Sequence, residues 1–187
     1  MKITNAEWIR SGKPAECPVF ARDFAVDKAV RHAELEITAA GVYEAALNGR
    51  RVGDFFLAPG WTVYRTRLQV QTYDVTALLR SRNQLAVTVG SGWYCGTIAR
   101  LKTPQPVRLI ASLTIEYTDG TTDQIITDGS WQTTESATRY ADIYNGETCD
   151  ANFRDDSPVP AVVDDAFPKS QLIPQQGEPV RLQERLK

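Results

Sequence analysis

Three segments of the sequence place aromatic side chains beside amide, carboxylate or guanidinium groups. They span residues 54–64, 92–100 and 144–150. A sugar presents apolar C–H faces and a ring of hydroxyl groups, so a site for it needs an aromatic platform with polar side chains around it. These segments have that chemistry. The predicted carbohydrate-binding residues are Asp54, Trp61, Trp93, Tyr94, Arg100, Asn145, Glu147 and Asp150.

A structural role is the alternative for the same types of side chain. Trp and Tyr also close the ends of β-sandwiches, where the ring is buried and the polar tip reaches a backbone group. Trp61 and Trp93 are open to both interpretations. Trp8 and Trp131 have no polar cluster around them, so they are predicted to be structural. For Glu147 the alternative is a solvated or strand-pairing carboxylate, because carboxylates are common on protein surfaces.

The sequence contains no motif with the spacing of a known catalytic site. Gly-x-Ser-x-Gly, a phosphate-binding glycine loop and His-Glu-x-x-His are all missing from it. Glu147 and Asp150 could act as acid and base in glycoside hydrolysis, but that role depends on a separation across a cleft that the sequence does not give. No catalytic residue is therefore predicted, and whether the chain has an activity of its own stays open.

Metal binding is limited by the residue types available. Carboxylates, Asn145 and loop carbonyl groups could hold calcium, which takes about 6–8 oxygen ligands, but their spacing is not that of an EF-hand loop. The three cysteines are far apart and form no Cys-x-x-Cys pair, so they are expected to be reduced structural thiols. His32, the one histidine, lies on the outward side of an alternating segment and is not expected to bind a metal. Calcium is the one cofactor left open.

The size and composition of the chain limit which classes of protein and partner are compatible with it. A chain of 187 residues with 42% hydrophobic and 24% charged residues can form one domain with a core of its own. The net charge of −2 argues against nucleic acid as a partner, because such proteins present a basic surface. No apolar run approaches the roughly 20 residues of a membrane helix. The first residues lack the apolar segment of a signal peptide, so a cytoplasmic location is expected.

The elements that must position these side chains are predicted to be strands. Apolar and polar residues alternate with period 2, the pattern of half-buried strands. The alternating segments are 33–39, 43–47, 68–70, 85–89 and 109–117. Asn48-Gly49 and Asp119-Gly120 are typical of tight hairpin turns. Asp74 is a plausible cap for one helical turn, and Gly90-Ser91-Gly92 is predicted to be a simple turn.

These strands recur every 8–12 residues or so without sustained helical periodicity, which is typical of an all-β sandwich or jelly roll. We expect a β-sandwich domain over residues 1–155. Five prolines fall beyond it. They predict an extended tail over residues 156–187, with a last strand or a linker near its end.

Three stretches of the sequence also resemble motifs of a known protein family. They read ITAAGVYEAALNGRRVGDFFLAPGWTVYRTRLQVQTYDVTALL, GSGWYCG and DIYNGETCDA. They are similar, in order and spacing, to motifs of the N-terminal β-domain of bacterial α-L-rhamnosidases, from about Trp8 to Phe153. Ser91, Cys95 and Asn152 depart from the acidic and basic residues that are usual in the family's loops.

The resemblance implies a jelly-roll sandwich of the galactose-binding-domain type. In that family it precedes a barrel that hydrolyses terminal α-L-rhamnose and carries the catalytic carboxylates. The implied partners are rhamnosides and the catalytic domain of the same parent chain, without nucleic acid or membrane. Two functions follow as hypotheses: a non-catalytic domain that binds or orients carbohydrate, or a structural module that packs between domains and binds no sugar.

Overall fold

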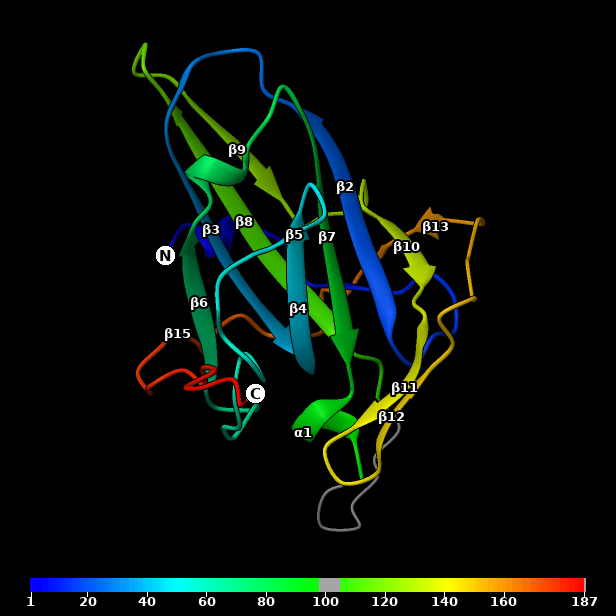
Figure 1. The fold of residues 1–187 in the computed structure, drawn as a ribbon. Helices are drawn as coiled ribbons and strands as arrows, with labels where there is room; N and C mark the ends of the chain where they lie inside the picture. Colours follow the sequence, from blue (N-terminus) through cyan, green and yellow to red (C-terminus); the bar gives the residue numbers. More distant parts are fainter. Residues whose placement is uncertain (98–104, 187) are drawn as a thin grey trace.

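The computed structural model describes residues 1–97 and 105–186, and within them the chain folds as two β-sheets packed face to face (Figure 1). The first sheet has the order β14 (Val162–Val163), β1 (Ile9–Arg10), β8 (Arg108–Tyr117), β3 (Val30–Ala40), β6 (Leu68–Asp74) and β15 (Leu172–Pro174), with β9 (Thr122–Ile126) also paired to β8. The second sheet has the order β13 (Val159–Pro160), β10 (Gln132–Glu135), β2 (Pro18–Ala25), β7 (Arg82–Gly90), β4 (Val42–Leu47) and β5 (Arg50–Arg51). The all-β sandwich expected from the alternating sequence is confirmed.

A separate hairpin and three short helical turns complete the described part of the chain. The hairpin consists of β11 (Thr138–Asp142) and β12 (Gly146–Cys149). The helical turns are the 3₁₀ segments η1 (Lys2–Asn5) and η2 (Thr76–Leu78) and the single α-helical turn α1 (Gly92–Cys95). The prediction of a simple turn at Gly90-Ser91-Gly92 is wrong, because the chain continues from these residues into α1.

The main core lies between the two sheets and follows the period-2 pattern. Leu35 and Ile37 of β3 point into it and are at most 1% exposed. Trp131 is fully buried in the same core, and its indole N–H donates to the Ile126 carbonyl at 2.7 Å. The structural role predicted for this tryptophan is thus confirmed.

A second apolar cluster covers the outer face of the first sheet. Its buried members are Ile3, Ala6, Trp8, Leu68, Val70, Ile110 and Leu172. The sequence pattern predicts that Glu36 and Thr38 of β3 face outward, yet they are only 8% and 0% exposed. The pattern fails here because the N-terminal turn η1 packs over this face, and the Ile3 backbone N–H donates to the Glu36 carboxylate at 2.5 Å.

The predicted turns have the backbone geometry that their residues favour. Asn48 and Gly49 both have positive φ, 56° and 73°, as a two-residue hairpin between β4 and β5 requires. The Asn48 side-chain amide also donates to the Leu78 carbonyl and to Asn83, both at 2.9 Å. Asp74 accepts the Thr76 backbone N–H at 2.9 Å and so holds the turn into η2, although Val75, and not the predicted Asp74, occupies the N-cap position. Local sequence therefore determines these two corners.

Residues 156–186 run back along both sheets. β13 pairs with β10 in the second sheet, and β14 pairs with β1 in the first. β15 adds to the edge of the first sheet in parallel with β6, with Leu172 opposite Leu68. None of the described helices is long and apolar enough to cross a membrane.

Candidate functional site

The three aromatic–polar segments gather at one end of the sandwich. In Figure 1 this end carries α1, the β11–β12 hairpin and the C-terminal segment. Two contacts tie the segments together: the rings of Trp61 and Trp93 are parallel neighbours, and Gly92 forms a β-bridge with Asp142. We call this region the loop end. Arg100, the remaining predicted site residue of the second segment, lies outside the described residues.

Trp61 and Trp93 form a parallel aromatic pair at the loop end. Their ring centroids are 6.4 Å apart and the planes differ by 4°. Trp61 follows the Pro59-Gly60 loop and is 66% exposed, whereas Trp93 is half-buried on α1. A large exposed indole held parallel to a second one provides flat apolar area of the kind that stacks on a sugar ring.

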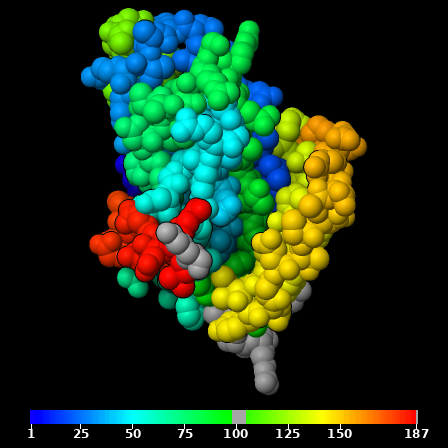
Figure 2. Space-filling model, viewed as in Figure 1, coloured from blue at the N-terminus to red at the C-terminus, as the bar shows by residue number. Residues whose placement is uncertain are grey.

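The pair stands at the rim of a pocket of about 270 Å³, which we call the tryptophan pocket. It is lined by Phe55, Phe56, Leu57, Ala58, Pro59, Gly60, Trp61, Gln69, Gln71, Trp93, Gln175, Glu178, Pro179 and Val180. Residues from the 55–61 loop, strand β6, α1 and the C-terminal segment therefore share one cavity. In Figure 2 the C-terminal segment, in red, packs against the cyan segment around residue 50.

Hydrogen bonds and one ion pair hold the C-terminal segment across this pocket. The Gln69 side-chain oxygen accepts the backbone N–H groups of Gln176 at 2.9 Å and Gly177 at 3.2 Å. The Phe56 backbone N–H donates to the Val180 carbonyl at 2.8 Å. Asp54, a predicted sugar ligand, instead pairs with Arg181 at 3.0 Å. Its carboxylate thus helps to fasten the pocket wall.

Gln71 of β6 forms a polar floor beneath the aromatic rim. It is 1% exposed, and its side-chain oxygen accepts the Tyr43 hydroxyl at 2.9 Å. The side-chain nitrogen has no hydrogen-bond partner among the described residues. Burial, and then the neighbouring Tyr73 hydroxyl, raise the pKa of Tyr43 well above its ordinary value, so this phenol remains a neutral donor.

Tyr94 points away from the pocket into a network of its own. Its hydroxyl accepts from Arg108 at 2.9 Å and donates to Gln105 at 2.7 Å. Its ring makes edge contacts with Tyr64 and Phe167, at centroid distances of 5.4 Å and 6.2 Å. Burial raises the pKa of the Tyr94 phenol. These contacts give Tyr94 a packing role beneath α1.

Asp142 organises the third segment, although sequence reasoning did not select it. Its carboxylate accepts the backbone N–H groups of Thr97, Tyr144 and Asn145 at 2.7, 2.8 and 3.0 Å, and also the Thr97 hydroxyl. Burial alone would raise the pKa of Asp142, but these hydrogen bonds outweigh it and hold the pKa below 3.8. The sequence signal was the Asp-x-Tyr-Asn spacing, since Asp side chains commonly accept backbone N–H groups two or three residues ahead.

The three predicted residues of this segment do not reach the tryptophan pocket. The Asn145 amide donates to the hydroxyls of Thr97 and Tyr140 at 2.8 and 3.1 Å. Glu147 lies on β12 and lines an adjoining groove of about 660 Å³ between the β11–β12 hairpin and strands β4 and β7, which shares Phe56 and Leu57 with the tryptophan pocket. Asp150 accepts the Asn152 backbone N–H at 3.0 Å. Their roles in sugar binding stay predictions.

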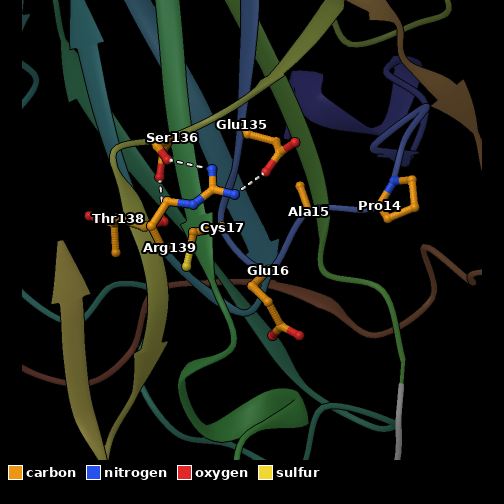
Figure 3. Close-up of a pocket in the computed structure, with 8 residues that line it drawn as sticks. All are labelled: Pro14, Ala15, Glu16, Cys17, Glu135, Ser136, Thr138 and Arg139. Atoms are coloured by element: carbon orange, nitrogen blue, oxygen red, sulfur yellow. Dashed lines mark hydrogen bonds and ion pairs between the residues drawn. The ribbon is translucent and has the colours of Figure 1, made fainter. Parts of the chain in front are cut away.

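Neither a metal centre nor a reactive thiol stands out. The described ranges contain no cluster of three or more His, Cys, Asp or Glu side chains that could hold a metal ion, and calcium binding through Asn and carbonyl oxygens stays a prediction. Cys17 lines a further cavity of about 280 Å³ beside Arg139, whose guanidinium pairs with Glu135 at 2.5 Å (Figure 3). Burial, followed by the Glu16 and Glu147 carboxylates, raises the pKa of Cys17 to about 11. The thiol therefore stays protonated at neutral pH.

Comparison with known proteins gives consistent matches. Residues 28–184 match the family described as the alpha-L-rhamnosidase N-terminal domain. An alpha-L-rhamnosidase of Alteromonas sp. (strain LOR) is 39% identical over 202 residues, covering 99% of this chain and 22% of that protein. The crystal structure of an alpha-L-rhamnosidase from Aspergillus terreus has a TM-score of 0.87 at 33% identity, covering 96% of this chain and 23% of that chain.

A second solved structure is similar to this chain over most of its length. The alpha-L-rhamnosidase of Streptomyces avermitilis, crystallised in complex with L-rhamnose, has a TM-score of 0.83 at 37% identity. The match covers 91% of this chain and 18% of that chain. The chain thus spans less than a quarter of the length of each of these three relatives.

Proposed function

The chain belongs to the family of alpha-L-rhamnosidase N-terminal domains, and on that basis we propose that it is a carbohydrate-binding accessory domain. It would hold rhamnosyl substrate for a catalytic domain elsewhere in a longer parent chain. In this proposal the parent enzyme hydrolyses terminal α-L-rhamnose from glycosides, and this domain contributes binding without chemistry.

The observation that carries the proposal is the parallel pair of Trp61 and Trp93 at the rim of the tryptophan pocket. Indole faces supply stacking area for the C–H face of a sugar, and the polar groups below supply partners for hydroxyls. Trp61 is 66% exposed. Leaving so large an apolar ring in water has no folding benefit, which favours a ligand or a partner surface over a packing role.

The direct test is titration of the domain with L-rhamnose, the sugar bound in the Streptomyces avermitilis structure. We expect saturable binding by calorimetry or by NMR shifts at millimolar sugar. We also expect Trp61→Ala to weaken it at least about fivefold, since loss of an aromatic stacking contact costs about 1 kcal/mol. Trp131→Phe, in the core, is a control that should leave binding unchanged. Absence of any heat or shift change with wild-type protein would refute sugar binding.

Interdomain packing is the second candidate, favoured by the exposed apolar side chains at the same end. They are Phe56, Leu57, Trp61, Val63, Tyr144, Val180 and Leu182. Contiguous exposed apolar surface commonly marks a protein contact. If this function holds, the domain added in trans to the parent catalytic region should bind it, and the Val63→Asp and Leu182→Asp variants should not. Sugar binding would then be absent from the isolated domain.

A further inference from the structure

We propose that Gln71 is the hydroxyl-binding residue of the tryptophan pocket, and that the pocket selects an uncharged polyhydroxylated ligand over an anionic one. This inference rests on the proposed carbohydrate-binding function. Beyond that function, the inference names the group of the pocket that contacts the ligand and the charge of the sugar that the pocket accepts.

Two glutamines on the same face of β6 differ in how many of their side-chain atoms form hydrogen bonds. Gln69 is fully engaged: its amide nitrogen donates to the Pro59 carbonyl at 3.3 Å, and its oxygen accepts two backbone N–H groups of the C-terminal segment. Gln71, two residues on, uses only its oxygen, which accepts from Tyr43. Its nitrogen is buried without a partner among the described residues. One glutamine therefore builds the pocket wall, and the other keeps an unused donor at the pocket floor.

An unpaired buried donor is uncommon, because the group has lost its water and gained nothing in return. The nitrogen is closed off in the unliganded chain, so a side-chain movement at the pocket floor must accompany binding; a ligand hydroxyl oxygen would then accept from the Gln71 nitrogen and restore the missing bond. The Tyr43 hydroxyl fixes the opposite end of the amide at 2.9 Å, so the donor is oriented before the ligand arrives. Such preorganisation lowers the entropic cost of binding.

A second unpaired group lies in the pocket wall. The side-chain oxygen of Gln175 is buried and has no partner within the described ranges, while its nitrogen donates to the Gly177 carbonyl at 3.1 Å. The pocket thus offers one free donor and one free acceptor. A hydroxyl group can satisfy both types, since it accepts and donates at the same oxygen.

The charge of the lining sets the class of ligand. Glu178 is the one charged side chain among the described residues that line the tryptophan pocket. A uronate would meet this carboxylate, and the guanidinium groups that stack on the lining rings of Phe56 and Phe55 already pair with carboxylates: Arg51 with Glu44 and Arg181 with Asp54. No unpaired cation among the described residues at this wall offsets the repulsion, and burying an unpaired charge is costly. A neutral sugar has no such penalty, and its apolar face can stack on the exposed ring of Trp61.

The experiment measures binding of L-rhamnose and of D-galacturonate to the wild-type chain and to two matched variants. Gln71→Leu removes the proposed donor. Gln171→Leu is the control, because Gln171 is likewise buried, at 2% exposed, and has an unpartnered amide, but it does not line the pocket. We expect L-rhamnose affinity to fall about tenfold in Gln71→Leu, as for loss of a buried hydrogen bond, and to be unchanged in Gln171→Leu. Galacturonate should bind the wild type at least about tenfold more weakly than L-rhamnose.

Each outcome is decisive. If the wild type binds L-rhamnose and Gln71→Leu binds it equally well, the role of Gln71 is overturned while the carbohydrate-binding function stands. Equal or tighter binding of galacturonate overturns the charge selection. If no sugar binds the wild type, the proposed function fails and this inference fails with it. Should Gln71→Leu not fold, the side-chain amide signals of Gln71 in ¹⁵N-labelled wild type decide: no shift at saturating L-rhamnose overturns the inference.

Discussion

At the scale of single residues, the Asp142 carboxylate joins two of the loops that meet at the loop end. It accepts backbone N–H groups from the 91–97 segment and from the 142–146 turn. A charged acceptor facing three backbone donors is among the stronger polar arrangements in a protein. Its hydrogen bonds connect the segment that carries Trp93 to the hairpin that carries Glu147.

Replacement of Asp142 by Asn should lower the free energy of unfolding by about 1–3 kcal/mol at pH 7, because an amide group would turn a donor toward backbone donors. The folded-state pKa of Asp142 lies below 3.8. Its stabilisation is therefore complete above about pH 5, roughly one unit above the ordinary pKa of an aspartate, and is lost as pH falls through the lowered folded value.

Urea unfolding at pH 7, 5 and 3 checks this prediction. The gap between the wild type and Asp142→Asn should be constant from pH 7 to 5 and should narrow at pH 3. Asp165→Asn, at an exposed position, serves as the control and should follow the wild type throughout. A gap that widens on acidification would contradict the assignment.

At the scale of elements, strand β15 links the C-terminal residues to the sandwich. Leu172 is 7% exposed and packs into the second apolar cluster with Leu68. Leu182, ten residues further along, is 54% exposed. The two leucines belong to the same proline-containing segment but differ in whether they contribute to a core.

We expect Leu172→Ala to lower the free energy of unfolding by about 2–5 kcal/mol, as for other buried leucines. Leu182→Ala should change it by less than about 0.5 kcal/mol, because its side chain already contacts water. Chemical denaturation of the two variants and the wild type measures both values. Equal effects would mean that β15 is not part of the cooperative unit.

Gly92 is the first residue of α1, and the position of Trp93 on this turn depends on it. Its φ is +51°, and a Cβ at this residue would lie 2.2 Å from a side-chain carbon of Val42. Gly92→Ala should therefore shift α1 and weaken L-rhamnose binding, together with a loss of stability of about 1–3 kcal/mol. Gly120→Ala is a matched control, because Gly120 also has positive φ but has open space around it. It should cost stability and leave sugar binding intact.

At the scale of the whole molecule, two apolar clusters lie on opposite faces of one sheet. The tryptophan pocket lies at the loop end, and the groove of about 660 Å³ lies beside the β11–β12 hairpin. The described side chains include neither a metal cluster nor an unengaged pair of carboxylates at the tryptophan pocket.

We expect the chain alone to show no turnover of an aryl α-L-rhamnoside, because glycoside hydrolysis needs two carboxylates facing each other across the substrate. A chromogenic assay at high protein concentration, with a full-length relative as positive control, measures this. Turnover that disappears in Glu147→Gln would instead place an active site in the hairpin groove.

The sequence by itself determined the strands of the five alternating segments, the Asn48-Gly49 turn and the family, but not strand β2 or the turn into α1. Period-2 alternation and the Asn48-Gly49 pair act within a few residues, so local physics was sufficient to predict them. The outward face of β3 could not be predicted as buried, because η1 covers it from the distant N-terminus.

Only the tertiary structure decided which polar groups are engaged. Gln69 and Gln71 are the same residue type on the same face of one strand, yet one is saturated and the other has a free donor. Trp61 and Trp93 likewise become a pair through folding alone. The physical reason is that hydrogen-bond and stacking partners come from segments far apart in the chain, so their presence is a property of the assembled fold.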